Sequence, residues 1–322
     1  MTARCCADCG KEEGGGVSLK ACKSCMLVKY CNADCQRNHW PEHKKACKQR
    51  AAEIHDEALF KDPPAKEDCP ICFLPMPSLL ICCVLLPPAT IMSGVPVYDF
   101  AKANEELAKI VTEQYCTYCG KSICGGCIHS VIMSGNNQKC PFCNSDRGTQ
   151  TDEEGVGELM KRVEVNDAGA IYVLGNYYYH GKIGLLRDQE RAIELWKQAA
   201  DLGYSKAHYQ LGTQYDTGRN SKKEKFHYEA AAMTGHEAAR YNLGCMDYEL
   251  GNRERAVKHW MIAASAGHHY AMDTMRDVFE KGLVNRNAID SILTAYNNSC
   301  AEIRSEARDT YIVFKQQQMG NI

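Results

Sequence analysis

The chain has 322 residues, which is enough for roughly two or three domains. Its net charge of −2 provides no strong basic field for nucleic acid, and its hydrophobic share of 45% is ordinary for a folded protein. Cysteine is the exception, because 18 of the 20 cysteines precede residue 144. The N-terminal stretch MTARCCADCG has no apolar core of a secretory signal, so we expect reduced thiols. Repeated C-x2-C pairs in a reduced protein indicate zinc sites.

The first expected domain, residues 1–50, contains eight ordered candidate zinc ligands. Zinc takes about four soft or borderline ligands in a tetrahedron, so these would hold about two ions. A C-x2-C turn points both sulfurs the same way, and a spacing of x3 puts two ligands on one helical face, which suggests short helices. The eight are Cys6, Cys9, Cys22, Cys25, Cys31, Cys35, His43 and Cys47.

This spacing, with the Tyr30-Cys31 step and the ending QRNHWPEHKKAC, resembles the MYND zinc finger. The resemblance implies interleaved sites, in which Cys6, Cys9, Cys31 and Cys35 hold one zinc and Cys22, Cys25, His43 and Cys47 hold the other. It also implies that the finger binds peptide motifs of partner proteins. Lysines and an arginine between residues 44 and 50 are interpreted as a solvated helix face, so no nucleic-acid partner is expected.

Residues 51–68 are polar, end in a Pro-Pro pair and are interpreted as a linker. The next domain is expected over 69–147, and inside it the stretch 76–98 carries no charge and looks membrane-like. Three prolines and a glycine interrupt this stretch well short of the ~20 apolar residues of a membrane helix, so no membrane span is expected. Residues 99–110 have the apolar spacing of an amphipathic helix.

The second domain contains four C-x2-C pairs, which are Cys69/Cys72, Cys116/Cys119, Cys124/Cys127 and Cys140/Cys143. The pattern CPIC…CGKSICGGCI…CPFC resembles the all-cysteine RING-like cross-brace. The resemblance implies that adjacent pairs do not share an ion. Cys69, Cys72, Cys124 and Cys127 would hold one zinc, and Cys116, Cys119, Cys140 and Cys143 a second.

The insert at 73–115 is longer than a usual RING loop and adds two further cysteines. Cys82 or Cys83 competes with Cys116 for the third ligand position. We favour Cys116, because it completes a C-x2-C pair whose second cysteine is followed by Gly120-Lys121, a knuckle turn.

Many RING domains bind a ubiquitin-charged E2, with zinc in a structural role, so no catalytic residue is expected. The resemblance assigns the E2 contact to Ile71 in the first knuckle, Ile128 after the sixth ligand and Pro141 after the seventh. A cation often follows the last ligand in that family, but Asn144 stands there in this chain. This departure leaves a degenerate RING, used only for assembly, as the alternative.

After a connector at 148–166, the sequence repeats with a period of 32 residues, marked by Gly203, Gly235 and Gly267. This period, with Ala and Gly at helix contacts, predicts paired helices stacked into a solenoid over 167–285. The pattern LGxxY…W/Y…AAxxG resembles Sel1-like repeats, relatives of the tetratricopeptide class. We expect three repeats, a partial fourth, and a capping helix and tail over 286–322, with one long helix over 288–314.

The expected fold is therefore mostly α, with an N-terminal finger, a RING-like domain and a C-terminal solenoid. This combination resembles a family expanded in diatoms and related algae. We expect a cytoplasmic or nuclear interaction scaffold with about four zinc ions. Its partners would be peptide motifs at the finger, a client on the solenoid and E2~ubiquitin at the RING-like domain, as in a ubiquitin ligase. The alternatives are a non-enzymatic adaptor and a chromatin-associated co-regulator.

Overall fold

The computed structural model describes residues 5–14, 16–76, 113–135, 139–145, 151–217 and 221–319, and most of these are helical. The chain divides into two units, Met1–Lys61 and Asp62–Ile322. The apolar run after residue 76, the helix expected over 99–110 and the competing cysteines at 82 and 83 lie outside the described residues. Within those ranges, no helix is long and apolar enough to cross a membrane.

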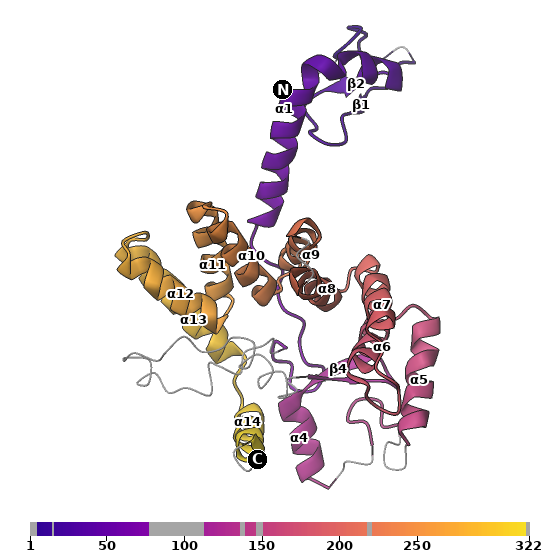
Figure 1. Ribbon diagram of the computed structural model, residues 1–322, viewed down its shortest axis with the longest axis vertical. Coiled ribbons are helices and arrows are strands. Elements are labelled where there is room, and N and C mark those ends of the chain that lie inside the picture. Colours follow the sequence, from indigo (N-terminus) through magenta and orange to yellow (C-terminus); the bar gives the residue numbers. More distant parts are fainter. Residues whose placement is uncertain are drawn as a thin grey trace. The chain divides into compact units, whose positions relative to one another are not determined.

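The first unit is a small zinc-finger-like fold followed by a long helix (Figure 1). Strands β1 (Lys20–Ala21) and β2 (Lys29–Tyr30) pair antiparallel and lead into α1 (Ala33–Leu59). The side chain of Asn32 caps α1 by accepting a hydrogen bond from the Cys35 backbone N–H at 2.8 Å.

The expectation of short helices in this unit is wrong, because α1 is one helix of 27 residues. It also extends through the first half of the segment expected to be a linker. The physical reason is composition: after Pro41, no proline or glycine interrupts a run rich in Lys, Gln, Arg, Ala and Glu, which all favour helix.

The second unit begins with the RING-like segment. Strands β3 (Glu113–Cys116) and β4 (Lys121–Cys124) form an antiparallel hairpin that pairs Cys116 with Lys121. Strand β4 passes directly into α4 (Gly125–Met133). This hairpin-and-helix arrangement places one cysteine pair on the hairpin turn and the next at the start of α4.

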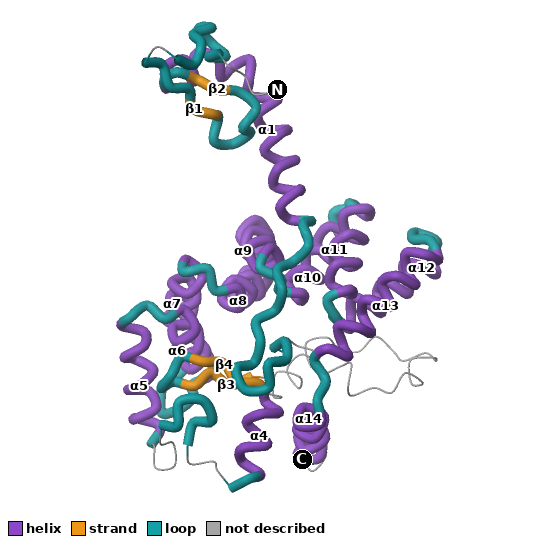
Figure 2. The backbone as a smooth tube through the Cα atoms, turned by 180° about the vertical axis from the view of Figure 1, so that it is seen from behind, coloured by secondary structure: helices purple, strands orange, loops and turns teal. Residues whose placement is uncertain are grey.

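The solenoid is built from consecutive antiparallel helices, which Figure 2 shows as stacked pairs. Helix α5 leads into three pairs that match the expected repeats, and α12 and α13 close the stack. The helices are α5 (Asp152–Glu164), α6 (Ala168–His180), α7 (Gln189–Asp201), α8 (Ser205–Thr217), α9 (Ser221–Met233), α10 (Glu237–Glu249), α11 (Arg253–Ser265), α12 (His269–Glu280) and α13 (Arg286–Glu302).

Each repeat packs a glycine of its first helix against an aromatic ring of its second. A Cβ atom at Gly175 would lie 2.7 Å from the indole of Trp196, and one at Gly212 would lie 2.6 Å from the ring of Tyr228. Gly244 meets Trp260 in the same way. The repeated Leu-Gly step of the sequence therefore exists because the two helices approach too closely for any side chain.

The expected single helix over 288–314 is wrong, because the chain breaks at Ile303–Ser305 and restarts as α14 (Glu306–Met319). The Ser305 hydroxyl accepts a hydrogen bond from the Arg308 backbone N–H at 3.3 Å, as an N-cap does. Helix α13 packs on α11 and α12 and caps the repeats. Helix α14 instead lies beside α4 of the RING-like segment, in both views (Figures 1 and 2).

A second contact joins the RING-like hairpin to the start of the solenoid. The Arg162 guanidinium, at the end of α5, donates to the backbone oxygens of Thr117 and Tyr118 at 2.7 and 2.9 Å. It also pairs with Asp167, which accepts a 2.7 Å hydrogen bond from the Tyr115 hydroxyl. Burial and the Asp167 carboxylate raise the pKa of Tyr115, so this hydroxyl remains a donor.

Two repeats carry histidine as a helix N-cap. His236 Nδ1 accepts from the Ala239 N–H at 3.4 Å, and His268 Nδ1 accepts from the Ala271 N–H at 3.2 Å. Burial lowers the pKa of both rings to about 4. Each ring must therefore stay neutral to cap its helix.

We predict that Gly244→Ala lowers the free energy of unfolding by about 1–3 kcal/mol, because the added methyl group displaces the buried indole of Trp260. Denaturant unfolding followed by far-UV circular dichroism measures this change. Gly157→Ala is the matched control, since Gly157 lies in α5 with nothing within 4 Å of its would-be Cβ. The control should be neutral or stabilising by up to about 1 kcal/mol, because alanine favours helix. Equal losses in both variants would contradict the packing argument.

We also predict that His268 makes the solenoid lose stability on acidification. Its folded pKa of about 4 lies below the ordinary value of 6.5, so the unfolded chain takes up the proton first as pH falls through that window. His268→Asn keeps a capping oxygen but does not titrate. The midpoint temperature of thermal unfolding should therefore fall less steeply between pH 7 and pH 4 in the variant than in the wild type. Parallel curves of midpoint against pH would refute the role given to His268.

Candidate metal centres

The structure collects the cysteine and histidine side chains into four groups, and within each group all candidate ligand atoms lie within 4.8 Å of one another. In the first unit the groups are Cys6, Cys9, Cys31, Cys35 and Cys22, Cys25, His43, Cys47. In the RING-like segment they are Cys69, Cys72, Cys124, Cys127 and Cys116, Cys119, Cys140. Pairs adjacent in sequence are thus divided between groups, which is the alternation that both family resemblances imply.

The distances within these groups suit zinc and not disulfides. The sulfur atoms of Cys31 and Cys35 are 3.5 Å apart, those of Cys22 and Cys47 are 3.7 Å apart, and those of Cys72 and Cys124 are 3.8 Å apart. A disulfide needs about 2 Å between sulfurs. A tetrahedron with Zn–S bonds of about 2.3 Å has edges of about 3.8 Å. His43 Nε2 faces the Cys25 sulfur at 3.2 Å and fits the same arrangement.

The C-x2-C pairs share a recurring backbone turn. In five of them the residue after the second cysteine has positive φ and donates its N–H to the carbonyl of the first cysteine at 2.8–3.0 Å. These residues are Gly10, Met26, Phe73, Gly120 and Asn144. The remaining pair, Cys124 and Cys127, is held by the first turn of α4 instead. The backbone of the folded chain therefore directs both sulfurs of a pair toward the same group, in every pair except Cys140 and Cys143.

The second RING-like group contains Cys116, the residue favoured for the third ligand position. Cys116 and Cys140 are buried, and the Cys119 and Cys140 sulfurs are 4.0 Å apart. Cys143, expected as the fourth ligand, is exposed and lies outside the tight group. Its sulfur contacts the Ser145 hydroxyl at 3.1 Å, although its knuckle turn has the same backbone hydrogen bond as the others. The structure therefore brings together three of the four ligands expected for this group.

In the second group of the finger, the pKa values of two thiols favour a bound cation. Burial opposes ionisation of Cys22, but the His43 side chain and backbone N–H groups lower its pKa to about 6. Burial and then the Cys22 and Cys25 sulfurs raise the pKa of Cys47 to about 12. One thiolate thus forms readily and suppresses the next. A divalent metal removes this conflict, because it allows all four ligands to bind in their basic forms.

The first RING-like group is covered by an arginine from the C-terminus. Arg308 of α14 is buried, and its guanidinium donates to the sulfurs of Cys124 and Cys72, each at 3.4 Å. It also donates to the backbone oxygens of Leu74 and Pro75 in the same knuckle at 3.3 and 2.9 Å. No sequence pattern pointed to this residue, which lies 184 positions from Cys124.

The three residues expected to contact an E2 have partly exposed side chains. Ile71 and Ile128 pack against the cysteine core of the RING-like segment, and Pro141 is half-buried in the last knuckle. Two larger apolar side chains project further. Phe73 is 77% exposed after the first knuckle, and Phe142 is 47% exposed inside the last. The sequence analysis did not select these phenylalanines, although each adjoins a residue that it did consider.

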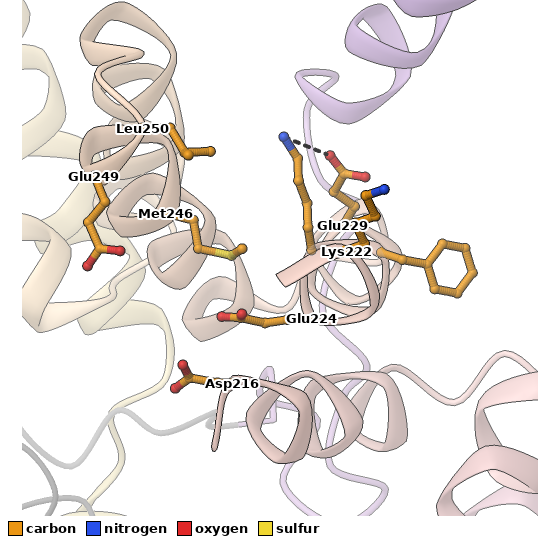
Figure 3. A pocket seen from close by; sticks show the side chains of 9 residues that line it. Asp216, Lys222, Glu224, Glu229, Met246, Glu249 and Leu250 are labelled. Atoms are coloured by element: carbon orange, nitrogen blue, oxygen red, sulfur yellow. Dashed lines mark ion pairs between the residues drawn. The ribbon is translucent and has the colours of Figure 1, made fainter. Parts of the chain in front are cut away.

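The solenoid carries a hollow of about 480 Å³ along α8, α9 and α10 (Figure 3). Its polar lining includes Asp216, Glu224 and Glu249, and Met246 and Leu250 supply apolar surface. Burial, and then the charges of Asp216 and Glu249, raise the pKa of Glu224 to about 7. This hollow is a surface feature of the repeats, distinct from the cysteine groups.

Comparison with known proteins identifies two of the modules. Residues 6–47 match the family described as MYND finger, and residues 168–204 and 238–268 match the family described as Sel1 repeat. The chain thus combines a MYND finger with Sel1 repeats, and the cysteine groups between them fit RING-like zinc sites. This defines a zinc-finger and repeat scaffold of the protein-interaction class, with side chains for about four zinc ions.

Two curated relatives are similar over short segments. The human histone-lysine N-methyltransferase SMYD3 is 47% identical over 34 residues, which are 11% of this chain and 8% of that protein. A SET and MYND domain-containing protein of Dictyostelium discoideum is 52% identical over 33 residues, 10% of this chain and 6% of the relative. The match therefore spans less than a tenth of either relative.

Two solved structures are similar to part of this chain. A Sel1 repeat protein from Oxalobacter formigenes is 29% identical and covers 38% of this chain and 97% of its own, with a TM-score of 0.36. The protective antigen c5321 of uropathogenic Escherichia coli, which displays an SLR fold, is 19% identical. The match covers 60% of this chain and 44% of that protein, with a TM-score of 0.38.

We predict that native mass spectrometry of the full chain finds about four zinc ions. Cys124→Ser should remove about one, because serine is a poor ligand at a thiolate site. Cys5→Ser is the matched control, since Cys5 is exposed and outside every group. Loss of zinc in the control, or full occupancy in Cys124→Ser, would contradict the grouping.

Chelation should unfold the finger while most of the helical circular dichroism signal of α6–α13 persists, because those helices contain none of the grouped ligands.

Proposed function

We propose that the chain is a RING-type ubiquitin ligase that uses its MYND finger and Sel1 repeats to bring substrates to an E2~ubiquitin conjugate. The observation that supports this most directly is the alternation of the cysteine pairs between two metal groups around β3, β4 and α4. Such a module acts by holding the conjugate, so its zinc ions are structural. No side chain of the module would act as a nucleophile.

Apolar residues of the two outer knuckles support an E2 surface. Ile71 and Phe73 belong to the first knuckle, and Pro141 and Phe142 to the last. In RING domains the corresponding loops contact the E2, together with the residue after the sixth ligand, which is Ile128 here. The exposed phenylalanines extend this surface, since aromatic residues contribute strongly to protein interfaces.

The finger and the repeats would supply substrate recruitment. Both are protein-interaction modules, and a solenoid offers an extended surface to a client. We propose a reducing compartment, cytoplasm or nucleus, because cysteines that bind zinc must stay reduced. Methyltransferase activity is not part of the proposal, since the similarity to such an enzyme covers only 8% of it.

A second function, a non-enzymatic adaptor, is favoured by one observation. Asn144 stands where ligases of this kind often have a cation, and its backbone has a φ of 58°. Asparagine tolerates this left-handed conformation better than most residues, so the knuckle turn gives a structural reason for its presence. In the adaptor, the RING-like domain would serve assembly alone.

Autoubiquitination with a panel of E2 enzymes separates the two functions. We predict activity with at least one E2, reduced about tenfold or more by Ile71→Ala, because central apolar contacts of an interface are worth about 1–3 kcal/mol. Leu186→Ala is the control, since Leu186 is 87% exposed in the loop between α6 and α7. Zinc content should be unchanged in both variants. Inactivity with every E2, with Ile71→Ala and wild type alike, would reject the ligase and leave the adaptor.

A further inference from the structure

Arg308 is a buried arginine that faces a module other than the one formed by the helices next to it in sequence. Arg308 belongs to the C-terminal helix α14, yet it is only 5% exposed and faces the first RING-like metal group. An arginine has about five N–H donors, and a buried one costs stability unless they are satisfied.

All five donors of Arg308 have partners. Its Nε donates to the Cys124 sulfur, and its Nη2 donates to the Cys72 sulfur and the Leu74 oxygen. Its Nη1 donates to the oxygens of Pro75 and Ile303 at 2.9 and 2.7 Å. Four of these five acceptors belong to the RING-like module, and two of them are candidate zinc ligands.

The charge of the site calls for such a residue. Four cysteine thiolates around one Zn²⁺ carry a net charge of about −2, and burying that charge is costly without compensation. Arg308 supplies one positive charge and hydrogen bonds to two sulfurs, one from each of the two pairs in the group. Without the thiolates, a buried guanidinium would itself be uncompensated.

The helix that carries Arg308 fits α4 closely. A Cβ atom at Gly126 would lie 2.7 Å from the Arg308 backbone nitrogen, so the helices approach to backbone contact there. One turn further along α4, the His129 ring lies 4.8 Å from the Phe314 ring and 5.8 Å from the Tyr311 ring, centroid to centroid. The contact therefore extends from Gly126 to His129 on α4 and from Arg308 to Phe314 on α14.

We propose that Arg308 is a positioning residue of the first RING-like zinc site, and that α14 docks on α4 as a latch that depends on the metal at that site. The metal makes the four sulfurs anionic, the anionic sulfurs hold the guanidinium, and the guanidinium holds α14. Because such coupling is reciprocal, the docked helix also strengthens the binding of the metal.

This latch leaves the proposed E2 surface open. Gly126 and His129 face α14, whereas Ile128 lies about 100° round the helix from His129 and about 200° from Gly126. The inference rests on the zinc site and not on ligase activity. Its failure and the failure of the proposed function are therefore separate results.

The first test follows zinc release from the zinc-loaded full chain into a chromophoric chelator. We expect Arg308→Ala to release one of the about four ions 10–100-fold faster, because residues that hold metal ligands have effects of this size. Arg308→Lys should lie between, since it keeps the charge but loses the fork of donors. Arg304→Ala is the matched control, because Arg304 is exposed and pairs with Asp309 of α14 itself. Unchanged release in Arg308→Ala, or equal acceleration of every ion, would overturn the proposal.

Cobalt(II) substitution distinguishes positioning from general stabilisation. Hydrogen bonds to a thiolate weaken it as an electron donor, so Arg308→Ala should shift part of the sulfur-to-cobalt charge-transfer absorption to lower energy. Phe314→Ala weakens the docking of α14 from its other end and leaves the guanidinium in place. It should accelerate release of the same single ion severalfold without this spectral shift. Superimposable spectra of Arg308→Ala and wild type would overturn the role at the sulfurs.

The reverse direction is tested by hydrogen exchange. Removing the metal with a chelator should abolish protection of the α14 amides, while α13 keeps its protection because it packs on the repeats. Persistent protection of α14 in the metal-free chain would overturn the latch.

Discussion

Buried sulfur charge is the constraint on which the second unit depends. The RING-like module has a small core, made largely of its own cysteines and a few apolar side chains such as Ile123. Modules of this size rarely fold on apolar burial alone and rely on a metal. Four thiolates around one Zn²⁺ carry a net charge of about −2, so the module buries concentrated negative charge. Side chains from the helical half anchor the module at its metal groups.

Two arginines from the helical half perform this anchoring at opposite metal groups. Arg162, at the end of α5, donates to the carbonyls of the Cys116–Cys119 knuckle. Arg308, on α14, donates to the Cys69–Cys72 knuckle and to sulfurs of its group. Both use the planar fork of the guanidinium, which can satisfy several acceptors at once, as a lysine cannot. The module is thus held from the beginning and from the end of the solenoid.

Local features of the fold were predictable from the sequence, because their causes are local. Zinc-ligand spacing marks the cysteine pairs, and the 32-residue period marks the helical pairs. Even the Leu-Gly steps have a local signature, since Gly175 and Gly244 recur in register with Trp196 and Trp260. Only some of the knuckle turns could be predicted from the sequence. A glycine such as Gly10 indicates a left-handed residue, whereas Met26 and Phe73 adopt the same conformation without being glycine.

The parts that could not be predicted depend on contacts between distant segments. The apolar stripe through Ile303 and Phe314 has helical spacing, so it predicts one helix, and only the Ser305 cap hints at a break. Nothing in the periodicity says that Phe314 faces His129 rather than the repeats. The pairing of Arg308 with Cys72 spans 236 positions and involves one arginine among many charged residues.

That long-range pairing changes how the C-terminal tail should be understood. A terminal helix of a solenoid is ordinarily a cap, whose polar outer face protects the last repeat from water. In this chain α13 takes that role, which leaves α14 without a function in the repeats. Its buried arginine donates to two sulfurs of the first RING-like group, and the charge of these thiolates offsets the cost of burying the guanidinium. Helix α14 is therefore a structural part of the zinc module and not of the repeats, which α13 caps.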